Sequence, residues 1–173
     1  FAAVGLLYVK QEKLLYFPEI GGLPKRPANN PKMYRSPEEH NIQRYENIMI
    51  ENNHDRVRTN AWLLLHENSK HLPTIIFFHG NAGNIGLRLP NAVQMFRTLS
   101  SNILMVEYRG FGDSDNVQPT EYGMRRDSEA ALNFIRNHPH INPNKIFIFG
   151  RSLGGAVSFH LAQYAERNDI PVA

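Results

Sequence analysis

The chain lacks cysteine altogether: none occurs among its 173 residues. That absence excludes a disulfide scaffold, a zinc site built on thiolates and a cysteine nucleophile. It leaves the cellular compartment open, because secreted and cytosolic domains alike can lack cysteine. The chain also lacks a large excess of charge of either sign, since it has 19 Lys and Arg residues and 16 Asp and Glu residues. A net charge of +3 that is spread along the chain gives no footprint of nucleic-acid binding.

A hydrophobic run long enough to cross a bilayer is also missing. Residues 1–9 are uncharged and mostly apolar, and Lys10 follows them. Nine helical residues reach only about 14 Å, half of a bilayer core. The residues alone leave two interpretations open: the end of a transmembrane or signal segment that starts upstream, or an N-terminal helix that docks on the domain.

Residues 10–41 are interpreted as a lead-in connector, because prolines, glycines and asparagines crowd them and no apolar periodicity is present. Strand-forming residues follow at 45–50 and 57–65, on either side of turn-forming residues at 52–55. This pattern predicts an antiparallel hairpin.

After residue 73, short apolar runs alternate with helical periodicity. The runs cover residues 74–78, 103–106 and 146–149, and runs that are apolar on both faces are typical of buried parallel strands. The intervals between and after them place apolar residues three and four apart, as amphipathic helices do. The order predicts an α/β fold with a doubly wound, mostly parallel sheet behind the hairpin. Residues 169–173 resemble the start of a further strand.

A G-x-S-x-G sequence, Gly150 to Gly154, follows the third run directly. Chemistry in such sheets collects at the carboxyl ends of the strands. A sharp turn from strand to helix would expose the hydroxyl of Ser152, and Gly150 and Gly154 would remove side chains that collide in that turn. The sequence string alone is a weak signal. Its position between a strand and a helix predicts Ser152 as a nucleophile rather than as part of a plain turn.

A second glycine-rich segment, residues 79–84, follows the first run. Acyl transfer places negative charge on a carbonyl oxygen, which two backbone N–H groups can stabilise. We expect these groups to belong to Asn81 and Leu153, with His79 and Gly80 supporting the loop. The alternatives are a turn that His79 and the asparagines stabilise, or a phosphate-binding nest. A dinucleotide site is disfavoured, because neither glycine cluster spells G-x-G-x-x-G.

The segment 108–114 follows the second run and contains Asp113 and Ser114. We expect it to be a structural loop that shapes the floor of the site rather than a source of catalytic groups. The charged residues of the next expected helix are predicted to form a solvated face; they are Arg125, Arg126, Asp127 and Glu129.

The strings HGNAGN, YRGFGDS and GRSLGGA, in this order and with these intervals, resemble the alpha/beta-hydrolase domain-containing protein 13 family, as does KLLYFPE at residues 13–19. The resemblance covers the chain from about residue 10 to residue 173. It implies an α/β-hydrolase fold, Ser152 as the nucleophile, and residues 1–9 as the end of a single N-terminal membrane anchor. Glu107 stands where Asp is commoner and Phe111 where Tyr is more usual, and neither difference is expected to touch the chemistry.

The related protein 17 branch of that superfamily removes palmitate from proteins and carries an N-terminal cysteine cluster. The absence of cysteine in this chain argues against that branch. In the α/β-hydrolase fold the catalytic triad runs Ser, then Asp or Glu, then His. After Ser152 the chain offers His160, Glu166 and Asp169, and His160 would lie about 12 Å along the helix from the turn. We therefore expect the general base and its acid outside residues 1–173.

These observations predict three parts: an anchor remnant (1–9), a connector (10–41) and the N-terminal portion of an α/β-hydrolase domain (42–173) whose C-terminal part is missing. The predicted function is that of a membrane-anchored serine hydrolase, which cleaves an ester or thioester substrate through an acyl-enzyme on Ser152. Protein depalmitoylation is one form of that chemistry. No metal, organic cofactor or nucleic-acid partner is expected, because a base, an acid and two N–H donors suffice. The alternative is a scaffold of the same fold that binds a lipid or protein without turnover.

Overall fold

The computed structural model describes residues 12, 15–19 and 21–173. In this part of the chain, five strands form one mixed sheet in the order β1-β2-β4-β3-β5. The strands are β1 (Tyr45–Glu51), β2 (Arg58–Leu64), β3 (Thr74–Phe78), β4 (Asn102–Val106) and β5 (Ile146–Gly150). The helices are α2 (Leu89–Thr98), α3 (Glu121–Arg136) and α4 (Leu153–Arg167), with short 3₁₀ turns η1 (Pro27–Asn29), η2 (Pro37–His40), η3 (Ser69–His71) and η4 (Ile85–Arg88).

The predicted hairpin is confirmed: β1 and β2 pair antiparallel, with Tyr45 opposite Leu64 and Glu51 opposite Arg58. Its turn closes through the backbone N–H of Asn52, which donates to the carbonyl of Val57 over 3.0 Å. β2 then pairs antiparallel with β4, whereas β3 lies parallel to both β4 and β5. The parallel part of the sheet therefore begins at β4, as the alternation of runs and helices indicates.

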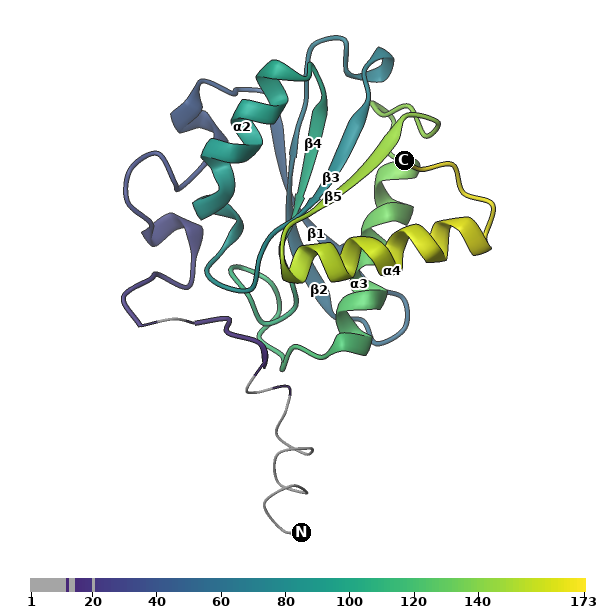
Figure 1. Ribbon diagram of the computed structural model, residues 1–173. Coiled ribbons are helices and arrows are strands. Elements are labelled where there is room, and N and C mark those ends of the chain that lie inside the picture. The colour runs from purple at the N-terminus through teal and green to yellow at the C-terminus, as the bar shows by residue number, and fades with distance from the viewer. Residues whose placement is uncertain (1–11, 13–14, 20) are drawn as a thin grey trace.

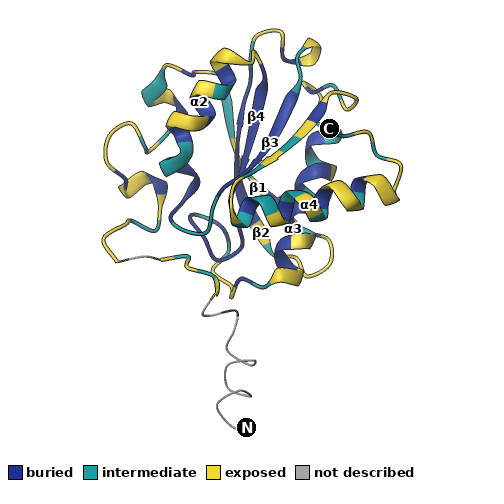
Figure 2. Cartoon of the chain, in the orientation of Figure 1, coloured by how far each residue is buried: buried dark blue, intermediate teal, exposed yellow. Residues whose placement is uncertain are grey.

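Helices cover both faces of the sheet, with α2 on one side and α3 and α4 on the other (Figure 1). Each strand sends alternate side chains to the two faces, so two separate cores form. The core under α2 contains Trp62, Leu64, Phe77, Met105 and Phe96. The core under α3 and α4 contains Leu63, Ile76, Leu104, Leu132 and Leu161. Figure 2 shows the resulting block of buried strands between helices whose outer sides are exposed.

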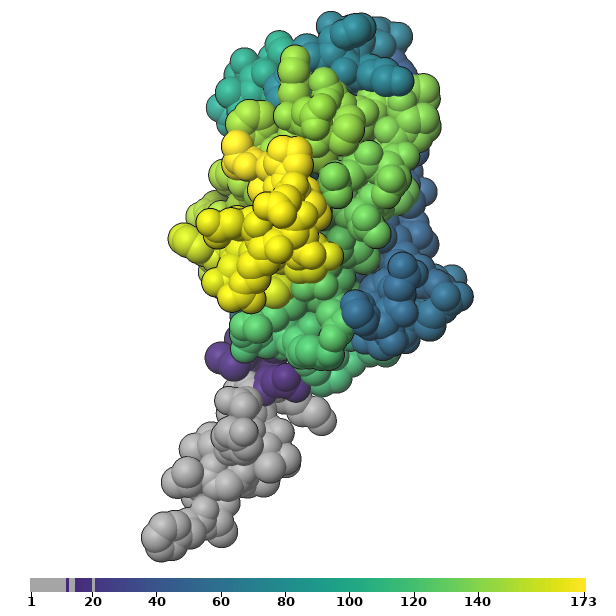
Figure 3. Space-filling view, turned by 90° about the vertical axis from the view of Figure 1, so that its right-hand side faces the viewer, coloured from purple at the N-terminus to yellow at the C-terminus, as the bar shows by residue number. Residues whose placement is uncertain are grey.

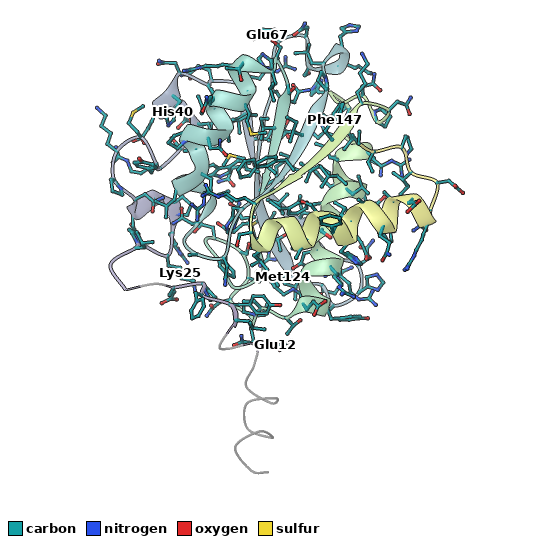
Figure 4. All side chains as sticks on the ribbon, viewed as in Figure 1. Glu12, Lys25, His40, Glu67, Met124 and Phe147 are labelled. Carbon is teal, nitrogen blue, oxygen red and sulfur yellow. The ribbon has the colours of Figure 1, made fainter. Side chains whose placement is uncertain are left out.

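β5 differs from the prediction of a strand buried on both faces. Phe147, labelled in Figure 4, is 45% exposed and Phe149 is 36% exposed, because β5 is an edge strand of the described sheet. Ala173 exchanges backbone hydrogen bonds with Ile146 and Ile148 of β5, at 3.0 and 2.7 Å. That is the pairing of a parallel neighbour; the predicted strand does not begin near residue 169, because Asn168 and Asp169 form a turn and, of residues 169–173, only Ala173 pairs with β5. Figure 3 shows this C-terminal part of the chain, in yellow, beside the green of α3.

The prediction of a solvated face on α3 is wrong for Asp127. This carboxylate is 2% exposed and accepts hydrogen bonds of 2.7 Å from both Nε and Nη2 of Arg109. Asp55 binds the outer side of the same guanidinium over 2.8 Å. Burial by itself lowers the pKa of Arg109, but its bonds to Asp127 and Asp55 outweigh burial and raise the pKa.

The predicted anchor remnant, residues 1–9, lies outside the described residues. Within the described part of the chain, no helix combines the length and the apolar character that a membrane span needs.

Candidate active site

Ser152 sits in the turn between β5 and α4 with a strained backbone, at φ 55° and ψ −117°. Its side chain is exposed. A Cβ atom on Gly150 would overlap the carbonyl of Gly154, and one on Gly154 would overlap the carbonyl of Phe78 at the end of β3. Glycine at both positions is what lets strand and helix approach closely enough to hold Ser152 in this conformation.

The loop after β3 lies against this turn. A Cβ atom on Gly80 would lie 3.7 Å from Cβ of Ser152 and 3.6 Å from the carbonyl oxygen of Arg151. The backbone N–H groups of Asn81 and Leu153 have no hydrogen-bond acceptor among the described residues. Asn81 therefore lies in the loop that contacts this turn, Leu153 directly follows Ser152, and the N–H groups of both are unengaged within the described residues.

The glycine-rich loop is fixed from beneath by His79. Nε2 of His79 lies 2.6 Å from Oε1 of Glu107, and Nδ1 lies 2.7 Å from the carbonyl oxygen of Gly80. The phenol of Tyr108 donates to the carbonyl of His79 over 2.6 Å, and burial raises the pKa of that phenol well above its ordinary value. Both ring nitrogens of His79 are thus occupied, so the imidazole binds the loop and Glu107 rather than facing Ser152 as a base.

Ser152 opens into a pocket of about 460 Å³ between this loop, η4 and α2. Asn81, Arg88, Arg151 and Tyr34 also line it. Tyr34 comes from the connector, and no pattern in the sequence places the connector near the site. The family model described as alpha/beta hydrolase fold matches residues 73–172, the segment that contains this pocket's loop, its turn and Ser152. The chain belongs to the alpha/beta hydrolase fold family.

Known relatives of this alpha/beta hydrolase agree with that family. Protein bem46 of Schizosaccharomyces pombe is 36% identical over 160 residues, which are 92% of this chain and 50% of that protein. Alpha/beta hydrolase domain-containing protein WAV2 of Arabidopsis thaliana is 39% identical over 156 residues, 90% of this chain and 48% of that protein. The predicted resemblance to alpha/beta-hydrolase domain-containing proteins is confirmed. The chain spans about half the length of these relatives.

Solved structures show the same fold. An alpha-beta hydrolase from Vibrio vulnificus superposes with a TM-score of 0.69 at 22% identity, over 86% of this chain and 50% of that one. An esterase from Pyrobaculum calidifontis gives a TM-score of 0.64 at 19% identity, over 80% and 44%. At such identities the likeness concerns the fold alone, and it confirms the predicted α/β-hydrolase fold class.

In the described part of the chain, no side chain beside Ser152 is available to accept its proton. His79 is the one imidazole that lines the pocket, and both of its nitrogens are engaged. His160 points away along α4 and binds Glu129 of α3, with 2.8 Å between Nε2 and Oε1. The described residues also contain no group of three or more His, Cys, Asp or Glu side chains that could hold a metal ion.

The sequence missed two supports of the site. In the sequence, Glu107 stood out only as a replacement of the commoner Asp; in the structure its Oε2 accepts the backbone N–H of Ile85 over 2.9 Å while Oε1 lies 2.6 Å from Nε2 of His79. The lead-in was interpreted as a connector and not as part of a site. Instead, Oδ1 of Asn81 accepts the backbone N–H of Phe17 over 3.1 Å, and Nδ2 of Asn81 donates to the carbonyl of Leu15.

Proposed function

We propose that the full-length protein is a serine hydrolase that cleaves ester or thioester bonds through an acyl-enzyme on Ser152. One observation carries the proposal: a strained, exposed serine at a strand-to-helix turn lies beside two unengaged backbone N–H groups, those of Asn81 and Leu153. A turn of purely structural use needs neither the strain nor the free donors.

In the proposed reaction, Oγ of Ser152 attacks the acyl carbon and loses its proton to a general base. The negative charge that develops on the substrate oxygen is stabilised by the N–H groups of Asn81 and Leu153. The alcohol or thiol leaves with a proton, and an acyl ester remains on Ser152. Water, deprotonated by the same base, then attacks that ester and releases the acid.

The general base and its orienting acid are proposed to come from outside residues 1–173. Two features support this: His79 is bound on both ring nitrogens, and the relatives are about twice as long as the matched region. Membrane attachment through the apolar residues 1–9 is likewise a proposal, and carbonate extraction of the full-length protein tests it. Release into the soluble fraction would contradict the anchor but leave the role of Ser152 untouched.

The test of the catalytic role is labelling of the full-length protein with a fluorophosphonate probe. We expect labelling of the wild type and none of Ser152→Ala, with hydrolysis of short esters reduced by several orders of magnitude. Ser158→Ala is the matched control, because Ser158 lies on α4 and its Oγ has no hydrogen-bond partner in the described structure. It should label as the wild type does.

Two results would contradict the proposal. Labelling that persists in Ser152→Ala would place the nucleophile elsewhere. A folded full-length protein that neither labels nor hydrolyses esters would favour the non-catalytic scaffold instead.

A further inference from the structure

Two arginines share the pocket with Ser152. Arg88 ends η4 and is held there by a 2.8 Å hydrogen bond from Nη2 to the carbonyl of Ala82 in the glycine-rich loop. Arg151 directly precedes Ser152 and is exposed. Both side chains line the pocket, so two guanidinium groups border the space in which a substrate of Ser152 would lie.

Among the described residues, neither Arg88 nor Arg151 forms an ion pair with a carboxylate, whereas Arg109 pairs with both Asp55 and Asp127. The pKa of Arg88, which burial and the charge of Arg151 lower, is raised to a smaller extent by the charge of the buried Glu107. The nearby carboxylate of Glu107 is fully buried, and both of its oxygens are already engaged by His79 and by the N–H of Ile85. No carboxylate lines the pocket in the described structure.

The arrangement disfavours the charged form of Arg88. Burial lowers its pKa, and the charge of Arg151 lowers it further. Its Nε atom is buried and has no hydrogen-bond partner in the described part of the chain. A buried donor without an acceptor is unfavourable, and an anionic group in the pocket would relieve the repulsion between the two cations.

We infer that the substrates of this site carry an anionic group, a carboxylate or a phosphate, close to the ester or thioester bond, and that Arg88 and Arg151 bind it. The inference rests on the proposed function of Ser152 and names its substrate class. Guanidinium groups suit this role because their planar N–H donors match the oxygens of carboxylate and phosphate. Arg88 is the positioned member of the pair, since the loop carbonyl of Ala82 fixes one of its nitrogens.

The experiment measures kcat/KM of the full-length protein on matched pairs of esters. The first pair is p-nitrophenyl valerate and mono-p-nitrophenyl glutarate, which have equal chain lengths and differ by a carboxylate on the acyl side. The second pair is phenyl butyrate and the same ester with a phosphate on the phenyl ring, which places the anion on the leaving group. We expect a preference of about tenfold or more for the anionic member of at least one pair.

Arg88→Met and Arg151→Met should each reduce that preference, and the double variant should abolish it. The ratio between the two esters is the readout, so a general loss of activity does not imitate the effect. Arg167→Met is the charge-matched control, because Arg167 lies at the opposite end of α4 from Ser152; it should keep the wild-type ratio. Rising salt should weaken the preference in the wild type.

The inference is wrong if the active wild type shows no preference in either pair, or if both arginine variants keep the wild-type ratio. The second result would indicate that the arginines serve another part of the protein. These outcomes are distinct from failure of the proposed function, which appears as labelling of Ser152→Ala or as no turnover of any ester.

Discussion

The imidazole of His79 and the carboxylate of Glu107 form a fully buried pair, with 2.6 Å between Nε2 and Oε1. The pair joins the end of β3 to the end of β4, and the other carboxylate oxygen holds the first residue of η4. The carboxylate of Glu107 therefore binds both ends of the glycine-rich loop, at His79 and at Ile85. A loop that must present the N–H of Asn81 in one place gains its rigidity from this arrangement.

Replacing Glu107 by Ala should destabilise the full-length protein strongly. The change leaves a buried imidazole and a buried N–H without their partner, and breaking a buried pair of this kind costs about 3–5 kcal/mol. Urea unfolding measures the loss. Glu46→Ala is the control, because Glu46 is 42% exposed in its 3.2 Å contact with His138 and such a pair contributes about 1 kcal/mol or less. Equal stability of the two variants would show that the buried pair does not hold the loop.

Substitution by Ala is expected to have opposite effects at Gly154 and at the neighbouring Gly155. A methyl group at Gly154 would overlap the backbone carbonyl of Phe78, whereas one at Gly155 would meet only the carbonyl of Gly150, at 3.8 Å. Gly154→Ala should abolish fluorophosphonate labelling of Ser152. Gly155→Ala should label normally and should be slightly more stable, by about 0.5–1 kcal/mol, because alanine favours the helix. Normal labelling of Gly154→Ala would contradict the tight contact between α4 and β3.

The sequence predicted the elements of this fold because their signals are local. Apolar runs followed by glycine identified β3 and β5, and G-x-S-x-G between a strand and a helix identified Ser152. The same local reasoning located Asn81 through its place after the first parallel strand. Such patterns depend on residues that are adjacent in the chain, so they can be read without knowing the tertiary structure.

The missed features depend on residues far apart in the chain. Asn81 and Phe17 are separated by 64 positions, and Arg109 and Asp55 by 54, so no periodicity relates them. Glu107 did offer a signal: it directly follows the apolar run of residues 103–106, and a carboxylate in a buried segment must be paired. Asp127 had no such signal, because it is one of several charged residues on α3 and the others are not buried.

Arg109 is expected to be essential for stability and dispensable for the chemistry. Its side chain is 7% exposed and neutralises Asp127, which is 2% exposed. Arg109→Met should therefore lower the free energy of unfolding by about 3–5 kcal/mol. Arg58→Met is the control, because the pair of Arg58 with Asp115 is largely exposed and should contribute about 1 kcal/mol or less. Urea unfolding of both variants decides the matter, and a small loss for Arg109→Met would argue that Asp127 finds another partner or becomes protonated.

Asn81 links the lead-in to the candidate oxyanion site, since its side chain binds the backbone of Leu15 and Phe17 while its own N–H stays free. Asn81→Ala keeps the backbone N–H and removes both side-chain bonds. We expect hydrogen exchange at the Phe17 amide to accelerate, because its acceptor is gone. The rate of fluorophosphonate labelling should fall about three- to thirtyfold, as two hydrogen bonds of about 1 kcal/mol each no longer hold the loop.

Asn133→Ala serves as the control for that variant. Asn133 lies exposed on α3, and its side chain makes no hydrogen bond in the described structure, so both measurements should match the wild type. The prediction would be contradicted if Asn81→Ala exchanged faster at the Phe17 amide but labelled at the wild-type rate. In that case the lead-in would rest on the loop without positioning it, and the support of the candidate oxyanion site would reduce to the buried pair of His79 and Glu107.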